Sequence, residues 1–464
     1  MSGDGALPDD LSRWIEREAG GPVTSARRHL VGASRQAWSV DVERDGDTSA
    51  LFVLRDLGRG GGSRRDAAVL RALAPTAVPV PTVHAHDREL GALLLERVEG
   101  RSDFPAVDDE ADREPTARHL MELTAALHAL APDDLPIEHL GAPPSAPDHA
   151  VTQLAAVEGV AEMIGDQLHP LFAITLVWLR RHLPAGRSST SLVHSDMGPG
   201  NFLAAAGRVT AVLDWEVAHW GDPMEDLAAV AVRDMATPMG HLLDRFAEYE
   251  AAGGAAVDTT VVEWYRILVL TRNAMFIGLG LGGDDPAVDR AQLTMYRTML
   301  MRAAALVLCD AVGVARPTVE PFAPQDGPSP ATFGRAGLAD LVAHARRDQD
   351  DTVRPALDDA YAAGRAAGVA GVLGTLEGHL RHGAERDERE RDQLAVVLGR
   401  RPGSVSDGLS ELATVVRDGA ETTEPAFEGA VAAALAVHML HEAALAAPLL
   451  GELADRVPQP LEAP

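Results

Sequence analysis

Alternating apolar and polar positions near the N-terminus predict a small antiparallel sheet. Residues 36–42 alternate, Asp45-Gly46 supplies the residues of a tight hairpin turn, and residues 50–54 form a second β-rich run. A later pair of β-rich runs, 83–86 and 92–95, flanks another polar turn. We therefore expect an antiparallel sheet of about five strands in the first hundred residues.

Helical spacing replaces this alternation on both sides of the last hairpin. Residues 64–73 carry apolar side chains at helical spacing, which predicts one helix packed on the sheet. From about residue 116 to about residue 312 the apolar period is 3.6, and one stripe consists of Leu120, Leu123, Leu127 and Leu130. Two short β-like runs, 191–193 and 209–213, interrupt it and flank loops rich in Gly, Pro, Asp and Asn. Polar loops of this kind are common functional sites.

A proline-rich segment separates this region from a final helical part. The segment 315–331 has the composition of a linker, with prolines at positions 317, 321, 324, 328 and 330. Further helices are expected at 338–346, 358–380, 388–398 and 428–445. We therefore predict an α+β chain that ends in an all-α domain without a chemical motif. Its parts are a β-rich lobe at 1–100, a helical lobe at 101–314, the linker at 315–331 and a C-terminal domain at 332–464.

Composition excludes several classes of function. The chain has 464 residues, too many for one ordinary core, and a formal net charge of −28, which argues against a nucleic-acid partner. Lysine is absent, so all 41 basic residues are arginine, and Schiff-base chemistry and a Walker A loop are both excluded. Cys309 is the only cysteine, which fits a reducing compartment.

The termini and the apolar segments give no sign of export or membrane insertion. The first ten residues lack the basic and apolar regions of a secretory signal. The apolar segment 430–450 is interrupted by His438, His441, Glu442 and Pro448, so a buried helix is expected there. We expect a cytoplasmic protein that does not insert into membranes.

The segment from His194 to Asn201, His-Ser-Asp-Met-Gly-Pro-Gly-Asn, places a carboxylate and an amide in one Gly- and Pro-rich loop. Asp214 follows at the end of an apolar strand, in Val-Leu-Asp-Trp-Glu. Phosphoryl transfer to a hydroxyl needs an acceptor for the hydroxyl proton and oxygen ligands for Mg²⁺. Asp196 could supply the first, while Asn201 and Asp214 could hold the metal ion.

These motifs resemble those of the aminoglycoside phosphotransferase and choline kinase-like family, which has an H-x-D-x-x-x-x-N loop and an I-D-W-E strand end. The resemblance implies a kinase-like bilobal fold, Mg²⁺, and ATP or GTP as phosphoryl donor. It makes Asp196 the catalytic base and gives His194, the other candidate catalytic residue, a structural role. The motifs Gly221-Asp222-Pro223 and Glu225-Asp226-Leu227 also match, and the family's aspartates there support the catalytic loop.

The resemblance extends upstream to the nucleotide-binding lobe. Gly32 and Ser34 match the loop that covers the phosphates. Arg55 stands at the third-strand position where kinases have a lysine, and Asp66 stands where their helix offers a glutamate. Both depart from the kinase pattern, although arginine keeps the charge. The backbone of the remaining two candidates, Glu96 and Val98, matches the hinge that meets adenine.

The acceptor and the C-terminal domain are less constrained. The motifs Val78-Pro79-Val80-Pro81 and 96–100 resemble most the branch joined to acyl-CoA dehydrogenases, which favours a hydroxyl on an acyl chain or small metabolite. One alternative is a catalytically impaired pseudokinase, which the missing third-strand lysine favours. Another is a helical scaffold whose acidic loop has no chemistry. The C-terminal domain could dock a protein partner or a second copy of the chain.

Overall fold

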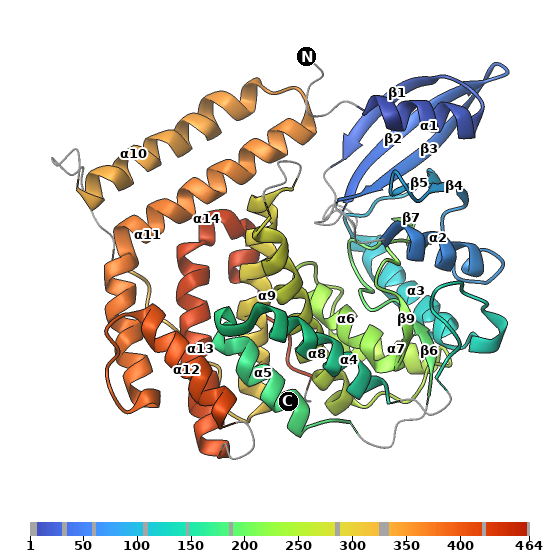
Figure 1. Cartoon of the computed structure of the whole chain (residues 1–464). Coiled ribbons are helices and arrows are strands. Elements are labelled where there is room, and N and C mark those ends of the chain that lie inside the picture. Colours follow the sequence, from blue (N-terminus) through green and yellow to red (C-terminus); the bar gives the residue numbers. More distant parts are fainter. Residues whose placement is uncertain are drawn as a thin grey trace. The chain divides into compact units, whose positions relative to one another are not determined.

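The computed structural model forms two compact units (Figure 1). The first consists of Met1–His149 and Ala185–Val262, and the second of Ala150–Pro184 and Glu263–Pro464. The structure describes residues 7–29, 35–57, 62–104, 110–144, 148–184, 189–283, 288–323, 334–419 and 424–461.

A five-stranded antiparallel sheet begins the first unit, as the alternating pattern predicts. The strand order is β1-β2-β3-β5-β4. Asp45 and Gly46 form the turn between β2 and β3, both with positive φ (53° and 91°), as a two-residue type I′ hairpin requires. The strands are β1 (Val23–His29), β2 (Arg35–Arg44), β3 (Asp47–Asp56), β4 (Val83–Asp87) and β5 (Ala92–Glu96).

Helix α1 (Asp9–Ala19) covers one face of this sheet and has no counterpart among the predicted elements. Its buried side chains Leu11, Trp14 and Ile15 pack against Trp38 and other apolar residues of β2, β3 and β5. Even-numbered positions of β2 therefore face α1, because side chains alternate along a strand. Odd-numbered positions, beginning with Arg35, face the opposite side of the sheet.

The rest of the first unit is mainly helical with two small two-stranded sheets. Helix α2 (Gly62–Leu73) contacts β3, β4 and β5, as the sequence predicts. Strand β6 pairs with β9, and β7 forms a hairpin with β8, so the two β-like runs of the sequence lie in different sheets. The remaining elements are α3 (Glu110–His128), β6 (Ser191–Val193), β7 (Phe202–Ala205), β8 (Arg208–Val212), β9 (His219–Gly221), α6 (Pro223–Asp234) and α7 (Leu242–Ala251).

The second unit is helical in its described residues. Helix α9 packs against α13, α5 packs against α12, and α10 runs beside α11 (Figure 1). Its helices are α4 (His149–Ile164), α5 (Pro170–Arg181), α8 (Thr259–Leu281), α9 (Arg290–Ala311), α10 (Arg335–Asp348), α11 (Ala360–Leu398), α12 (Val405–Asp418), α13 (Pro425–Leu445) and α14 (Ala447–Leu450), with short turns at Gln349–Val353 and Gly451–Asp455.

The predicted break near residues 381–387 is wrong, because α11 runs unbroken through them. This charged stretch contains good helix formers, and Arg389 bonds Glu385 one turn away. The compact units also differ from the predicted domain division, since α5 and α9 pack with the C-terminal helices. Whether each predicted domain folds alone stays a prediction.

The mixed α+β class is confirmed, with a sheet at the N-terminus and an all-helical C-terminal region. Among the described residues, no single helix is long and apolar enough to cross a membrane. Helix α13 and the segment Ala447–Asp455 meet the length and composition limits only as a pair, which bends by 72° at the break.

Candidate functional site

The loop after β6 is held by the buried carboxylate of Asp226 on α6. Asp226 accepts hydrogen bonds from the backbone N–H groups of His194 (3.0 Å) and Ser195 (2.6 Å). Ser195 has a φ of 67°, a conformation that costs a non-glycine residue about 1–3 kcal/mol. The hydroxyl of Ser195 donates to Glu225 at 2.5 Å. This support matches the role that the family resemblance implies for the acidic residues of α6.

His194 holds this loop in place through hydrogen bonds at both of its ring nitrogens. The ring is fully buried, and its Nε2 lies 2.7 Å from the Leu213 carbonyl oxygen. Its Nδ1 accepts the backbone N–H of Asp196 at 3.2 Å, so the partners assign the neutral tautomer protonated at Nε2. His194 therefore ties the loop to the residue before Asp214, and neither ring nitrogen is left over to act on a substrate.

The β7–β8 hairpin brings Asn201 next to Asp214. Phe202 pairs with Val212, and just beyond that pair Leu213 donates its backbone N–H to the Asn201 carbonyl oxygen at 2.8 Å. Asp214 follows directly, with a φ of 65°, a left-handed conformation that aspartate tolerates better than most residues. Eighteen positions of sequence separate Asp196 from Asp214, and a simple hairpin closes that gap.

Two side-chain oxygens at this hairpin are suited to a hard cation. The Asn201 amide nitrogen donates to the carbonyl and carboxylate oxygens of Asp196 (2.9 and 2.8 Å), and its amide oxygen accepts no hydrogen bond from the described residues. Oδ1 of Asp214 is buried and likewise accepts no hydrogen bond from the described part of the chain, although the Arg35 guanidinium lies 3.4 Å from it. Amide and carboxylate oxygens are the ligands that Mg²⁺ prefers, so Asn201 and Asp214 fit a magnesium site.

Asp196 is clamped by an arginine from α6. Arg233 donates from Nε to Asp196 Oδ1 at 2.8 Å and from Nη2 to Oδ2, and its Nη1 bonds the Pro199 carbonyl at 2.9 Å. Burial alone would raise the pKa of Asp196, but the Arg233 guanidinium and the hydrogen bond from Asn201 together lower it below its ordinary value. Asp196 is therefore a carboxylate at neutral pH, fixed in one orientation by a bidentate contact.

Arg35 of β2 contacts four carboxylates from three segments, namely β3, α2 and the segment after β8. Its guanidinium lies 2.5 Å from Asp66, 3.1 Å from Glu216, 3.3 Å from Asp56 and 3.4 Å from Asp214. The Arg35 side chain is only 5% exposed, and the surrounding carboxylates raise its pKa despite burial. One positive charge thus faces four acidic groups.

The carboxylate of Asp214 shows the effect of this excess negative charge. Burial raises the pKa of Asp214, Arg35 counteracts it, and Asp66 and Asp196 raise it further. A divalent cation at Asp214 would relieve this repulsion, because it adds positive charge where acidic groups crowd.

The structure does not bring Arg55 and Asp66 together. Arg55 follows Leu51 and Val53 on the face of β3 that packs on α1, and its Nη2 contacts Asp10 of that helix at 3.0 Å. Asp66 instead bonds Arg35, and its other oxygen accepts the Trp215 backbone N–H at 2.7 Å. Nucleotide contact by Arg55 stays a prediction.

The remaining predicted residues lie where β5 ends or outside the described residues. Glu96 is the last residue of β5, and its carboxylate accepts from the backbone and hydroxyl of Thr82. Val98 follows beyond the strand, in the segment leading to Arg101, which pairs with Ala204 of β7. Gly32 and Ser34 lie outside the described residues. Adenine contact at Glu96 and Val98 stays a prediction.

Sequence reasoning missed two residues that hold the site, Arg35 and Arg233. Both carried a readable signal. Arg35 continues the face of β2 opposite to the apolar positions that pack on α1. Arg233 lies seven residues after Asp226, and two turns of helix place both on the same face of α6.

The chain is similar to a known family profile and to known proteins. The sequence profile described as "Phosphotransferase enzyme family" matches residues 25–262, slightly more than half of the chain. Acyl-CoA dehydrogenase family member 11 from Rattus norvegicus is 29% identical over 179 residues, which are 36% of this chain and 22% of that protein. The Homo sapiens protein of the same name is 27% identical over 175 residues. The chain therefore matches about a fifth of the length of these relatives.

Solved phosphotransferases are also similar to this chain. Aminoglycoside phosphotransferase APH(4)-Ia, in a complex with ADP and hygromycin B, has 18% identity and a TM-score of 0.46, covering 62% of this chain and 98% of that one. Macrolide 2'-phosphotransferase MphH from Brachybacterium faecium has 18% identity and a TM-score of 0.46, covering 63% and 97%.

Proposed function

The chain belongs to the phosphotransferase enzyme family, and from that premise we propose that it transfers the γ-phosphoryl group of ATP to a hydroxyl of a small molecule. Family membership confirms the resemblance and the kinase-like α+β fold predicted from the sequence. The proposal adds the nucleotide, the dependence on Mg²⁺, and the roles of individual residues.

One observation carries the proposal. The fixed carboxylate of Asp196 lies beside two side-chain oxygens, the amide oxygen of Asn201 and Oδ1 of Asp214, that accept no hydrogen bond from the described residues. Oδ1 of Asp214 has an ion-pair contact with Arg35 at 3.4 Å, which is longer than a hydrogen bond of normal length. A purely structural loop would satisfy a buried carboxylate oxygen, because leaving it unpaired costs about 1–3 kcal/mol. A buried oxygen without a hydrogen bond at this position is therefore better explained by a metal ion that binds there in the working enzyme.

Asp196 orients the acceptor hydroxyl and takes its proton. The lowered pKa makes Asp196 a weak base. Weak basicity suffices, because the transition state of phosphoryl transfer is largely dissociative and the attacking hydroxyl needs little deprotonation before it. Orientation then matters more than proton affinity, and the bidentate contact with Arg233 fixes that orientation.

Asn201 and Asp214 would hold the magnesium ion, which supplies neutralisation of the charge on the phosphate oxygens. Arg35 keeps the acidic groups in place for that task. It ties Asp66 of α2 to Asp214, and Asp66 in turn binds the backbone at Trp215. Arg35 is thus a positioning residue, and this role does not require it to contact the nucleotide.

The acceptor is best sought among hydroxylated acyl groups. The curated relatives are named acyl-CoA dehydrogenase family member 11, in agreement with the branch that the motifs resemble. A hydroxyacyl thioester is therefore the first acceptor to test, ahead of sugars and aminoglycosides.

A catalytically impaired pseudokinase is the second candidate, and one contact favours it. Arg233 engages both oxygens of Asp196, which leaves fewer lone pairs for an acceptor hydroxyl. Under this alternative Mg-ATP binds but does not turn over.

The experiment measures ADP release from ATP with and without Mg²⁺, first alone and then with hydroxyacyl-CoA, sugars, simple alcohols and aminoglycosides. Mg²⁺-dependent release that rises with one acceptor class supports the enzyme and names its substrate class. Mg-ATP binding without release on any acceptor would favour the impaired form. Absence of both binding and release would contradict both the phosphotransferase and the pseudokinase proposals.

A further inference from the structure

A cavity of about 500 Å³ lies in the second unit, between helices α9, α11, α12 and α13. Charged side chains form part of its lining, among them Arg386 and Asp387 of α11 and Glu442 of α13. The Arg386 and Glu442 side chains are only 17% and 26% exposed, and partly buried charges need partners. The cavity is therefore a candidate binding site, separate in sequence from the phosphotransferase motifs.

Three potential metal ligands converge at one wall of this cavity. Ligand atoms of Glu390, His438 and Glu442 all lie within 4.8 Å of one another. Glu390 is 2% exposed and His438 is 8% exposed, so two of the three are almost completely buried. We propose that these residues bind a divalent transition-metal ion such as Zn²⁺ or Mn²⁺.

Rigid elements hold the three ligands. His438 and Glu442 are four residues apart on α13, so they lie on one face a turn apart, and Glu390 faces them from α11. The Nδ1 atom of His438 is 2.8 Å from a Glu390 carboxylate oxygen. Metal bonds of about 2.1 Å in tetrahedral geometry place ligand atoms about 3.4 Å apart, so separations of up to 4.8 Å need to shorten by at most about 1.4 Å and the 2.8 Å separation needs to widen by about 0.6 Å.

The kind of donor atom selects the class of ion. One imidazole nitrogen with two carboxylates suits Zn²⁺, Mn²⁺ or Fe²⁺ better than the all-oxygen sets that Mg²⁺ and Ca²⁺ take. His438 and Glu442 also line the cavity, which leaves room there for water or a ligand atom to complete the coordination. A second histidine, His441, contacts Glu390 from behind at 3.3 Å and would orient that carboxylate.

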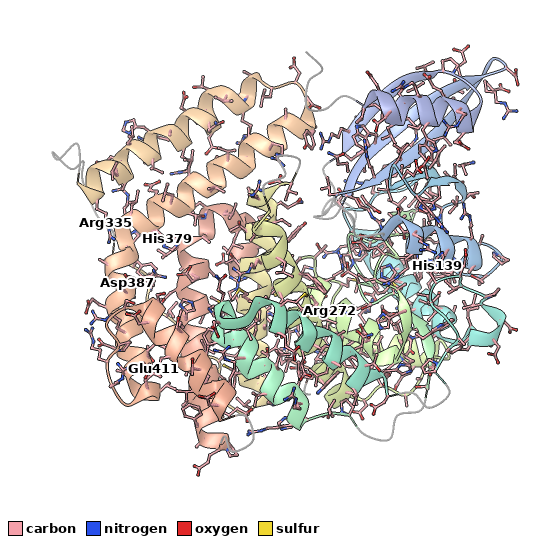
Figure 2. All side chains as sticks on the ribbon, viewed as in Figure 1. His139, Arg272, Arg335, His379, Asp387 and Glu411 are labelled. Atoms are coloured by element: carbon pink, nitrogen blue, oxygen red, sulfur yellow. The ribbon has the colours of Figure 1, made fainter. Side chains whose placement is uncertain are left out.

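A stabilising ion-pair network is the ordinary role for such a cluster, and Arg386 is its centre. Arg386 bonds Glu442, lies 3.9 Å from Glu390 and contacts Asp387 at 2.9 Å. Figure 2 shows that Asp387 and His379 both project from α11, and His379 is 3.9 Å from Glu442. Under our proposal the guanidinium competes with the metal ion for Glu442 and shifts toward Asp387 when the ion binds.

The effect of removing Arg386 on metal affinity therefore distinguishes a metal site from a purely structural network. Arg386→Gln removes the competing cation, so the metal affinity should rise. In a purely structural network Arg386 neutralises the carboxylates, so its loss destabilises the helices and creates no metal site.

The test measures Zn²⁺ and Mn²⁺ binding to the full-length, tag-free protein by calorimetry, with excess Mg²⁺ throughout. Absorption of bound Co²⁺ gives an independent signature of the ligands. His438→Ala and Glu442→Gln should each weaken binding about tenfold or more. The matched controls His344→Ala and Glu388→Gln change an exposed histidine and an exposed glutamate of the same unit, and they should bind as the wild type does.

The expected result is about one equivalent of metal in the wild type, weaker binding in both ligand variants and tighter binding in Arg386→Gln. No binding by the wild type, or equal binding by the wild type and the ligand variants, would overturn the proposal. If His438→Ala does not fold, as thermal melting will show, the isosteric Glu442→Gln decides. Asp214→Asn should leave this binding unchanged, so the outcome is independent of the phosphotransferase proposal.

Discussion

Arg35→Met is expected to destabilise the first unit strongly, whereas Arg55→Met is expected to have little effect. Arg35 is 5% exposed and contacts Asp66 and Asp56, which are 2% and 8% exposed. Removing one member of a buried ion pair costs about 3–5 kcal/mol, since the stranded carboxylates stay buried. The pair of Arg55 with Asp10 is 27% and 41% exposed, and such surface pairs contribute about 0–1 kcal/mol.

Urea unfolding followed by tryptophan fluorescence measures this difference, because Trp38 and Trp215 are both fully buried in the first unit. With a slope of about 2–3 kcal/mol per molar, Arg35→Met should lower the midpoint by about 1–2 M. Mg-ATP affinity should fall in the same variant, because Arg35 positions Asp66 and Asp214.

The loss of stability in Arg35→Met should also depend on pH. Burial and neighbouring acids already raise the pKa of Asp214, and loss of Arg35 raises it further. A carboxyl whose pKa is higher in the folded than in the unfolded state loses stability as the pH rises through that interval. The variant should therefore differ less from the wild type at pH 5 than at pH 8. A larger loss in Arg55→Met than in Arg35→Met, in stability or in nucleotide affinity, would refute this reasoning.

Three further substitutions probe the support of the loop. Asp226→Asn places an amide donor against two backbone N–H groups. We therefore expect the free energy of unfolding, measured in urea, to fall by about 1–3 kcal/mol and most turnover to be lost. Wild-type stability of this variant would contradict the anchoring role of Asp226. Arg233→Met removes the cation that lowers the pKa of Asp196 against the effect of burial, so the acid limb of the pH–rate profile should move to higher pH. An unchanged acid limb would contradict the role of Arg233 in holding Asp196. Gly198→Ala would place a Cβ 2.9 Å from the Cβ of Arg233, at a backbone φ of 137° that alanine rarely adopts. We therefore expect kcat to fall about tenfold or more. An unchanged kcat would show that the loop accommodates the added methyl group.

The proximity of Asp196, Asn201 and Asp214 could be predicted from the sequence, because these residues lie close together along the chain. Asp196 and Asn201 share one loop, and a single hairpin returns the chain to Asp214. The β2–β3 turn was equally predictable, since Asp45 and Gly46 are the residues that a type I′ turn requires.

The network of Arg35 could not be predicted in the same way. Its partners come from β3, α2 and the segment after β8, and only the tertiary fold brings these together. Analogy with kinases pointed to Arg55 on the third strand, but strand alternation turns that side chain toward α1. The predicted break within α11 failed for a related reason, because a run of charged residues interrupts an apolar stripe without interrupting a helix.

The central claim is that Asp196 performs a chemical step while Asp214 holds the metal ion. The most direct test is steady-state kinetics and Mg-ATP binding for Asp196→Asn and Asp214→Asn, with the exposed turn variant Asp45→Asn as control. We predict that Asp196→Asn keeps Mg-ATP affinity but loses about 10²–10⁴-fold in kcat. Asp214→Asn should lose Mg²⁺-dependent nucleotide binding itself, and Asp45→Asn should match the wild type. Undiminished kcat in Asp196→Asn would contradict the account.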